Sequence, residues 1–455
     1  MVIGNPPYVR QETLGAEFKQ YAQQRYAAYA GTADLYVYFI EQSHRLLRKD
    51  GCYGVICSNK FMRSNYGKPL RDFLATQTAI ESIVDFGELP VFQNAATFPA
   101  IILTRNTRSK RQQFDYAPIK RLDFGSLNDE VASSVRALDD RALSGENWTL
   151  ADSGELDILE KMRRIGTPLG EYANSEIYRG VLTGLNEAFI IDGDTHAALI
   201  RQDKKCSPLI KPFVSGDDVR KYHIRPSEKW LILLPKGWTH KQMQQTSPSE
   251  AQAWAWFEAR HPSLAQWLEP FTDKARKRTD QGDYWWELRA CDYYDKFEQP
   301  KIIYPDIAKE SRLTFVQGAL YFGNTAYFIP SSDLYLLGLL NSKLMFAYFK
   351  RYASVLGDAD KGGRLRWFRQ DVAKLPIRAI KPQEKQGRAD HDQLVALVEK
   401  MLALHQQLAA AKTPQDTTLL QRQITATDRQ IDQFVKQRPI LSTSQRPIFS
   451  TFSTF

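Results

Sequence analysis

Residues 1–106 alternate between short apolar runs and stretches with one apolar face. The apolar runs predict the tail of a strand at 1–4 and complete strands at 53–57, 80–86 and 99–104. Helices are predicted at 34–49, with Gly51 as the C′ glycine that ends the first of them, and at 68–76. Strands and helices that alternate at this spacing favour an α/β layer built on a mainly parallel sheet.

The pattern changes after residue 106. Residues 107–154 are polar and charged, which predicts a linker with short helices, and residues 155–380 carry short β-rich runs, aromatic clusters and basic loops typical of a second, α+β domain. Apolar positions at 394, 397, 398, 401, 404 and 408, and again at 420, 424, 431 and 434, predict a helical hairpin over 391–437. Residues 438–455 repeat Arg-Pro-Ile without either pattern and are expected to be a disordered tail.

Composition narrows the functional classes. The chain has 455 residues with 61 Lys and Arg against 52 Asp and Glu, a net charge of +9 that suits a polyanionic partner. Its four cysteines form neither a zinc pattern nor a disulfide framework, so we expect no metal site and a reducing, cytoplasmic environment. No apolar run is long enough for a membrane helix, and no secretory signal is visible.

The strongest chemical motif is the loop Asn5-Pro6-Pro7-Tyr8, which follows the first strand. An exocyclic amino nitrogen is a poor nucleophile because its lone pair is delocalised into the ring. Two acceptors placed at its N–H groups, the Asn5 amide oxygen and the Pro6 carbonyl, would localise that lone pair towards an incoming methyl group. The two prolines stiffen the loop, and Tyr8 can stack on a planar substrate. A strand-to-loop turn without chemistry remains the alternative reading.

The order of motifs around this loop resembles the N6-adenine DNA methyltransferases of the type IIG restriction–modification kind. The matching segments are residues 4–9 (GNPPYV), 34–36 (DLY), 54–61 (GVICSNKF), 83–92 (IVDFGELPVF) and 95–104 (AATFPAIILT). The resemblance implies a Rossmann-like methyltransferase sheet, S-adenosyl-L-methionine as cofactor, and an adenine flipped out of the duplex. It also implies that Asn5, Pro6, Pro7 and Tyr8 are catalytic, that Phe92 stacks on the base opposite Tyr8, and that Phe39 borders the cofactor. Core packing is the alternative for both phenylalanines.

Residues 155–380 resemble a TaqI-like C-terminal specificity domain that recognises double-stranded DNA. The matching segments are 178–191, 210–219, 301–305, 335–343, 362–369 and 375–377. Two basic clusters beside aromatic residues are the candidate DNA contacts, because basic groups bind phosphates and fix the register on DNA. They consist of Lys274, Arg276, Lys277 and Arg278, and of Lys361, Arg364, Arg366 and Arg369. A solvated charged surface is the alternative for each.

The sequence lacks a Gly-rich nucleotide-binding turn in its first 110 residues. We therefore expect only the carboxyl-side half of the methyltransferase domain, at 1–106, and a complementing amino-terminal methyltransferase or nuclease segment as partner. Two other functions stay open: a DNA-binding specificity fragment without activity of its own, and a protein-glutamine or RNA N-methyltransferase, since the same loop suits any planar amino or amide nitrogen.

Overall fold

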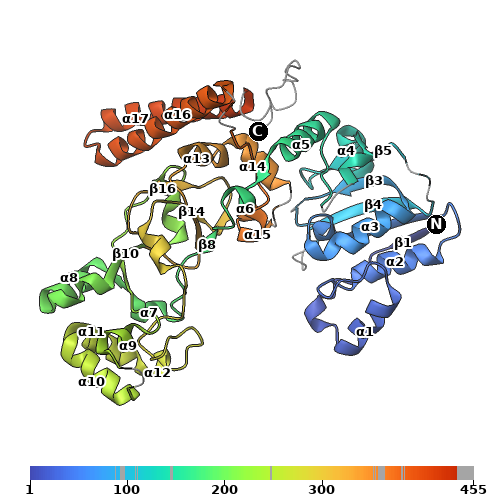
Figure 1. The fold of residues 1–455 in the computed structure, drawn as a ribbon. Coiled ribbons are helices and arrows are strands. Elements are labelled where there is room, and N and C mark those ends of the chain that lie inside the picture. The colour runs from blue at the N-terminus through green and yellow to red at the C-terminus, as the bar shows by residue number, and fades with distance from the viewer. Residues whose placement is uncertain are drawn as a thin grey trace. The chain divides into compact units, whose positions relative to one another are not determined.

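The computed structural model describes residues 1–437 except 88, 93–97, 108, 110, 144–146, 246–247, 352, 354, 357–363, 381–382 and 384 (Figure 1). The predicted tail, 438–455, lies outside the described residues. The chain forms two compact units. The first combines Met1–Arg164 with Tyr348–Arg366, and the second combines Ile165–Ala347 with residues 367–437.

A six-stranded sheet of order β1-β2-β4-β3-β5-β6 forms the first unit. The predicted strands are present as β1 (Val2–Gly4), β2 (Cys52–Ser58), β3 (Ala79–Asp85) and β4 (Pro99–Arg105). Four strands, β1, β2, β3 and β5, run in the same direction, as expected for a mainly parallel sheet. Strand β4 returns between β2 and β3 and runs antiparallel to both.

The sheet continues into the segment that we predicted to be a linker. Residues 107–154 contain β5 (Gln113–Pro118), which pairs in parallel with β3, and β6 (Arg136–Asp139), which pairs with β5. The linker prediction is therefore wrong. In Gln113–Pro118 the side chains of Gln113 and Asp115 are exposed and those of Phe114 and Tyr116 are buried, the alternation of a strand with one buried face.

Apolar side chains cover both faces of this sheet, which confirms the α/β fold class. Ile83 belongs to a large core with helices α2 (Tyr36–Leu46) and α3 (Lys68–Gln77), whereas its neighbour Val84 belongs to a second core with α4 (Leu127–Ser134). Helices α1 (Ala16–Arg25) and α5 (Ser153–Ile165) complete the helices of this unit. Helix α2 is shorter than predicted. It ends at Leu46, and Asp50, with φ 61°, adopts the left-handed conformation that we assigned to Gly51.

The second unit is α+β, as predicted. One four-stranded sheet has the order β16-β14-β18-β8 and another has the order β17-β10-β13-β9. Their strands are β8 (Tyr178–Arg179), β9 (Ile190–Asp192), β10 (Ile210–Val214), β13 (Lys229–Ile232), β14 (Lys301–Pro305), β16 (Thr314–Val316), β17 (Tyr321–Phe322) and β18 (Ala326–Pro330). A two-stranded ribbon joins β11 (Val219–Arg220) to β12 (His223–Ile224). The longer helices are α8 (Gly193–Gln202), α10 (Glu250–Arg260), α11 (Pro262–Leu268), α13 (Leu334–Leu340) and α14 (Lys343–Lys350).

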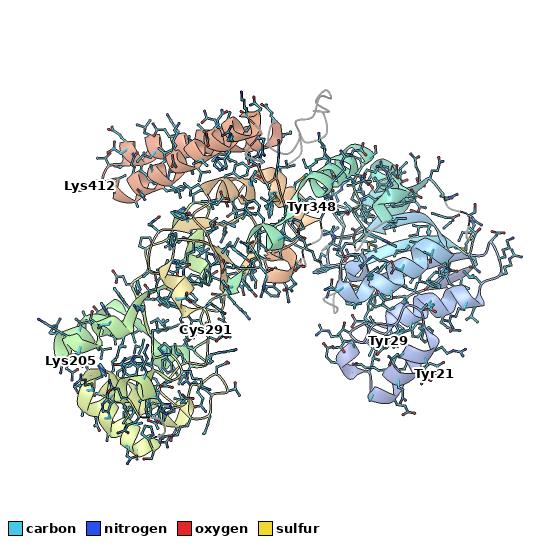
Figure 2. All side chains as sticks on the ribbon, in the orientation of Figure 1. Tyr21, Tyr29, Lys205, Cys291, Tyr348 and Lys412 are labelled. Atoms are coloured by element: carbon cyan, nitrogen blue, oxygen red, sulfur yellow. The ribbon has the colours of Figure 1, made fainter. Side chains whose placement is uncertain are left out.

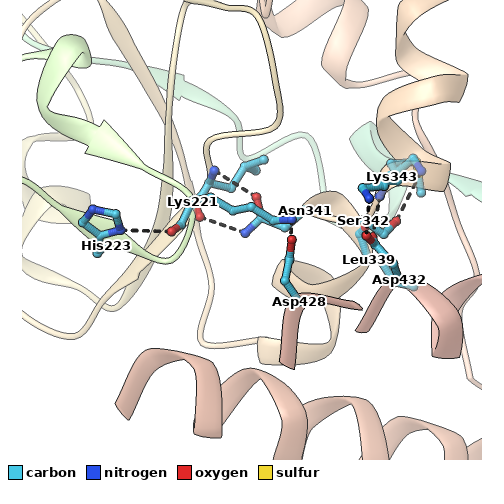
Figure 3. A network of polar contacts seen from close by, with 10 residues as sticks. Lys221, His223, Leu339, Asn341, Ser342, Lys343, Asp428 and Asp432 are labelled. Carbon is cyan, nitrogen blue, oxygen red and sulfur yellow. Dashed lines mark hydrogen bonds and ion pairs between the residues drawn. The ribbon is translucent and has the colours of Figure 1, made fainter. Parts of the chain in front are cut away.

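The predicted helical hairpin is present as α16 (Lys385–Ala410) and α17 (Pro414–Gln437), with Lys412 at the turn between them (Figure 2). Leu394, Val398 and Met401 of α16 are buried, as the apolar spacing predicts. Polar contacts attach α17 to the rest of the unit (Figure 3): Lys221 forms an ion pair with Asp428 at 2.6 Å, and the backbone N–H of Lys343 donates to Asp432 at 2.9 Å.

Among the described residues, no helix combines the length and the apolar character needed to cross a membrane. The four cysteines are free thiols.

Candidate functional site

The Asn5–Tyr8 loop leaves the sheet at the carboxyl end of β1. Strand β1 runs parallel to β2 with Gly4 opposite Val55, so the loop begins where ligands bind in open α/β sheets. Pro6 is buried and anchors the loop, while Asn5 and Pro7 are exposed. The chain beyond the loop is fixed to the start of α2, because Leu35 N–H donates to the Val9 carbonyl at 3.0 Å and Gln11 N–H donates to Asp34 at 3.1 Å.

Tyr8 lies beside Phe92, with ring centroids 6.0 Å apart and ring planes inclined by 55°. The structure thus brings together the two aromatic residues that the sequence analysis singled out. The Tyr8 hydroxyl donates to the Ile56 carbonyl of β2 at 3.4 Å. This hydrogen bond is long and therefore weak, so the aromatic ring is the part of Tyr8 that can contribute most to binding at this site. Burial, and secondarily the nearby Cys57, raises the pKa of Tyr8 to about 12, so Tyr8 stays a neutral phenol.

A polar group that sequence reasoning missed lies at the ends of β2 and β3. The Asn59 amide donates to Asp85 Oδ1 at 2.9 Å, and the same oxygen accepts the N–H of Gly87 at 2.9 Å. Gly87 has φ 57°, which suits a residue without a side chain. These residues line a cavity of about 190 Å³ together with Lys60, Met62, Arg63, Ser64, Tyr66, Phe98, Trp148, Leu150 and Ala353. The sequence signal that could have indicated this group is a polar residue at the end of each strand: Asn59 directly follows β2, and Asp85 is the last residue of β3.

Phe39 lies on α2 and is 44% exposed, so the core-packing alternative for this residue is wrong. Leu46, seven residues further along the same helix, is 73% exposed. Residues seven apart lie on one side of a helix, and the two side chains therefore give α2 an apolar surface. The surface is suited to a planar ligand or to another polypeptide.

The first basic cluster is largely neutralised within the chain. Lys274 forms an ion pair with Glu187 at 2.8 Å and Arg276 with Glu250 at 2.5 Å, while Lys277 is exposed. The aromatic residues beside it, Tyr284, Trp285 and Trp286, are core residues and offer no stacking surface.

Arg278 requires a correction. Its guanidinium is buried, stacks over the Phe189 ring at 4.5 Å, and donates to the carbonyls of Thr183, Trp285 and Glu287. Burial lowers the pKa of Arg278 to about 10. Because its donors are used inside the domain, Arg278 is a structural residue and not a DNA contact.

The second basic cluster is divided between the two units. Arg364 and Arg366 belong to β20 (Arg364–Arg366) in the first unit, where β20 pairs with β19 (Val355–Leu356). Arg369 belongs to the second unit, is exposed, and donates to the Ser175 carbonyl at 3.1 Å. Lys361 lies outside the described residues. Trp367 is buried, so only Phe368 of the two aromatic neighbours is partly accessible.

Comparison with protein families gives two matches. Residues 1–92 match the Eco57I restriction-modification methylase family, and residues 211–377 match the TaqI-like C-terminal specificity domain. The loop and Tyr8–Phe92 lie in the first matched segment.

Whole-chain comparisons agree with these matches. The chain is 27% identical to the type II methyltransferase M.PaeR7I of Pseudomonas aeruginosa over 395 residues, covering 83% of this chain and 64% of the relative. It is 25% identical to M.BstVI of Geobacillus stearothermophilus, covering 83% and 66%. The chain thus spans about two thirds of the length of these relatives. In fold it is similar to the type IIL restriction-modification enzyme MmeI solved in complex with DNA, with a TM-score of 0.57, 14% identity, and coverage of 95% of this chain and 53% of that one.

The two family matches, the curated relatives and the shared fold confirm the resemblance predicted from the motifs: this chain is a relative of the type II restriction–modification methyltransferases, and its residues 211–377 match a TaqI-like C-terminal specificity domain.

Proposed function

We propose that this chain holds the target base and reads the recognition site in a site-specific DNA adenine-N6 methyltransferase. The observation that carries the proposal is the placement of exposed Asn5 at the carboxyl end of β1, in the same loop as Tyr8 and with Phe92 beside Tyr8.

Each residue of the loop has a separate role in the proposed methyl transfer. The Asn5 amide oxygen and the Pro6 carbonyl accept hydrogen bonds from the adenine amino group, which localises the nitrogen lone pair. Buried Pro6 keeps these acceptors in place. S-adenosyl-L-methionine, when bound, supplies an activated methyl group, so the remaining contribution of the protein is positional. Phe39 is the residue of this chain that we propose to border the cofactor.

Tyr8 and Phe92 supply the stacking surfaces for the flipped base. A ring inserted between two others needs about 7 Å between the outer rings, since each contact takes roughly 3.5 Å. The observed centroid distance of 6.0 Å is close to this value, and the inclination of 55° means that the rings must turn parallel as the base enters. Base capture therefore involves a small adjustment of two side chains.

Double-stranded DNA is the proposed partner of the second unit. The specificity-domain match supports it, and a specificity domain of this size argues against a glutamine or RNA methyltransferase. The proposed contacts are Lys274, Arg276, Lys277, Arg364, Arg366 and Arg369.

We also propose that a further segment completes the sheet at β1. Strand β1 is the outer strand, and its Ile3 side chain is 75% exposed. An unpaired, apolar strand edge is a surface on which another strand can pair. The second candidate function is a DNA-binding specificity chain without activity of its own.

The experiment is methyl transfer to plasmid DNA by the purified chain, alone and with an amino-terminal methyltransferase segment added, followed by nucleoside analysis of the product. Formation of N6-methyladenine at one sequence supports the proposal. DNA binding without methyl transfer in both preparations supports the specificity chain instead. Methyl label on glutamine or RNA would overturn the substrate.

A further inference from the structure

Arg179 lies in the second unit, is partly exposed, and belongs to neither of the two basic clusters identified from the sequence. It lies on β8 directly opposite Tyr327 of β18, in an antiparallel pair. Side chains directly opposite on adjacent strands project from the same face of the sheet. The register therefore places the guanidinium beside the Tyr327 ring, with Cζ 5.7 Å from the ring centroid.

The orientation of this guanidinium is fixed by one further contact. Arg179 Nε donates to the Asn324 carbonyl at 2.8 Å. The guanidinium is thus held by a hydrogen bond at Nε and by a ring on one face. These two contacts fix the common direction in which Nη1 and Nη2 point. Among the described residues, none accepts a hydrogen bond from these two nitrogens, and no carboxylate lies within ion-pair distance.

Four other arginines of the unit differ in this respect, because their guanidinium donors are already used within the chain. Arg276 is paired with Glu250 at 2.5 Å, Arg289 with Asp280 at 3.2 Å and Arg312 with Glu310 at 3.0 Å, whereas Arg278 is buried among carbonyls. Arg179 combines a rigid position on a strand with two uncommitted donors, which is the arrangement that bidentate recognition requires.

The neighbours of Tyr327 extend the same surface. Phe368 lies 6.4 Å from Tyr327, and the next residue is Arg369, which is exposed. Arg369 carries a positive charge close enough to lower the pKa of Tyr304, the residue stacked on Tyr327 at 5.7 Å, although burial dominates and raises that pKa overall. Two arginines thus lie near one aromatic group, with Tyr304 of β14 buried behind it. We name the β8–β18 face by its other members, Arg179, Tyr327, Phe368 and Arg369.

We propose that Arg179 is a DNA-contacting residue that binds a pair of adjacent acceptors through Nη1 and Nη2, with Tyr327 and Asn324 as its positioning residues. The acceptors are either two phosphate oxygens or O6 and N7 of a guanine, both of which match the guanidinium fork. This inference rests on the proposed DNA binding of the second unit.

The test uses the whole chain and the duplex that it selects from a random pool. Arg179→Met removes the fork, and Arg179→Lys keeps the charge without the fork. Both are expected to weaken binding by about 10-fold or more, because a point charge cannot replace a bidentate contact. Arg260→Met, which removes an exposed arginine at the end of α10, is the matched control and should bind like the wild type.

Salt dependence and a repeated selection distinguish the two acceptors. A phosphate contact lowers the slope of log affinity against log salt by about one and leaves the selected sequence unchanged. A guanine contact relaxes the preference at one base pair. Tyr327→Leu should reproduce part of the loss, because the guanidinium loses its support on one face.

The inference would be overturned if Arg179→Met and Arg179→Lys, with melting temperatures equal to that of the wild type, bound the selected duplex as tightly as the wild type. Should Arg179→Met fold poorly, the Arg179→Lys variant decides. A wild-type chain that selects no duplex at low salt would overturn the proposed DNA binding itself, which separates the two failures.

Discussion

The rings of His223 and His405 stack face to face, with centroids 4.4 Å apart and planes inclined by only 18°. His223 comes from the β11–β12 ribbon and His405 from α16, so this stack joins the helical hairpin to the body of the second unit. Burial is the main cause that lowers the pKa of both residues, in His405 to about 4. The positive charges of Arg220 and Arg225 lower the pKa of His223 further.

The first prediction follows from these shifts. Both histidines bind protons more readily in the unfolded chain, where the pKa is about 6.5, than in the folded one. The stability contributed by the stack is therefore complete above pH 6.5 and is lost as the pH falls towards 4. The protection factors of residues 391–437 in hydrogen exchange, corrected for the pH dependence of the intrinsic exchange rate, should fall over this range. In His405→Gln the fall should be much smaller, and an identical pH profile of the protection factors in that variant would contradict the prediction.

The second prediction concerns Asn5→Ala. This change removes one of the two acceptors proposed for the adenine amino group, and it should lower the methyl-transfer rate of the completed enzyme by about 100-fold or more. Because Asn5 is exposed, the melting temperature should not change. Single-turnover kinetics on plasmid DNA measures the effect, and a wild-type rate would end the catalytic interpretation of the loop.

The third prediction separates the ring of Tyr8 from its hydroxyl. Tyr8→Phe should retain most activity, since the hydrogen bond to Ile56 is long at 3.4 Å. Tyr8→Ala should weaken capture of the flipped base by roughly 1 to 3 kcal/mol, the usual value of one base–aromatic stack, while duplex binding stays nearly intact. Fluorescence of 2-aminopurine at the target position reports base capture. Equal signals from the two variants would show that the ring does not stack.

The fourth prediction compares the buried Arg278 with its exposed neighbour Lys277. Arg278→Met leaves the buried carbonyls of Thr183 and Trp285 without the guanidinium donor and removes one of two donors from that of Glu287, and it should lower the free energy of unfolding by about 3 kcal/mol. Lys277→Ala should change stability by less than about 0.5 kcal/mol, because Lys277 is exposed. Chemical denaturation of both variants provides the measurement. If Arg278→Met were as stable as the wild type, its assignment as a structural residue would be incorrect.

The fifth prediction concerns Arg364 and Arg366. If Arg364 and Arg366 contact phosphates together with the other four proposed basic residues, the affinity for the selected duplex should fall by roughly 10³-fold between about 50 and 200 mM salt, the magnitude expected for about six phosphate contacts. The double alanine variant should bind more weakly and show a shallower salt slope. Unchanged affinity in that variant would remove β20 from the proposed interface.

Much of the fold could be predicted because local pattern determined it. The strands 53–57, 80–86 and 99–104 are apolar runs of strand length, and the hairpin is marked by regular apolar spacing with Pro414 at the start of α17. The Tyr8–Phe92 pair was accessible through motif order, since 84 residues separate the two positions and no local rule relates them.

The errors have a shared physical cause. Burial of Arg278, Trp285 and Trp286 depends on carbonyl groups and rings that arrive from distant segments, and a run of basic residues does not reveal this. The sheet position of β5 is likewise decided by its pairing with β3, which the short run Gln113–Pro118 does not reveal by itself. Asn59 and Asp85 needed the strand order before their proximity could be inferred.

The division of the chain into 1–164, 165–347, 348–366 and 367–437 has a consequence for engineering. The polypeptide leaves the first unit, returns to it for one short segment, and leaves it again. A transplant of recognition specificity between relatives therefore cannot be made with a single junction near residue 165. It must either carry residues 348–366 of the donor along, which exchanges part of the recipient's first unit, or splice at three places and retain that segment from the recipient. Chimeras built with these two plans should differ in folding yield. Residues 348–366 are the segment whose exchange should be optimised first.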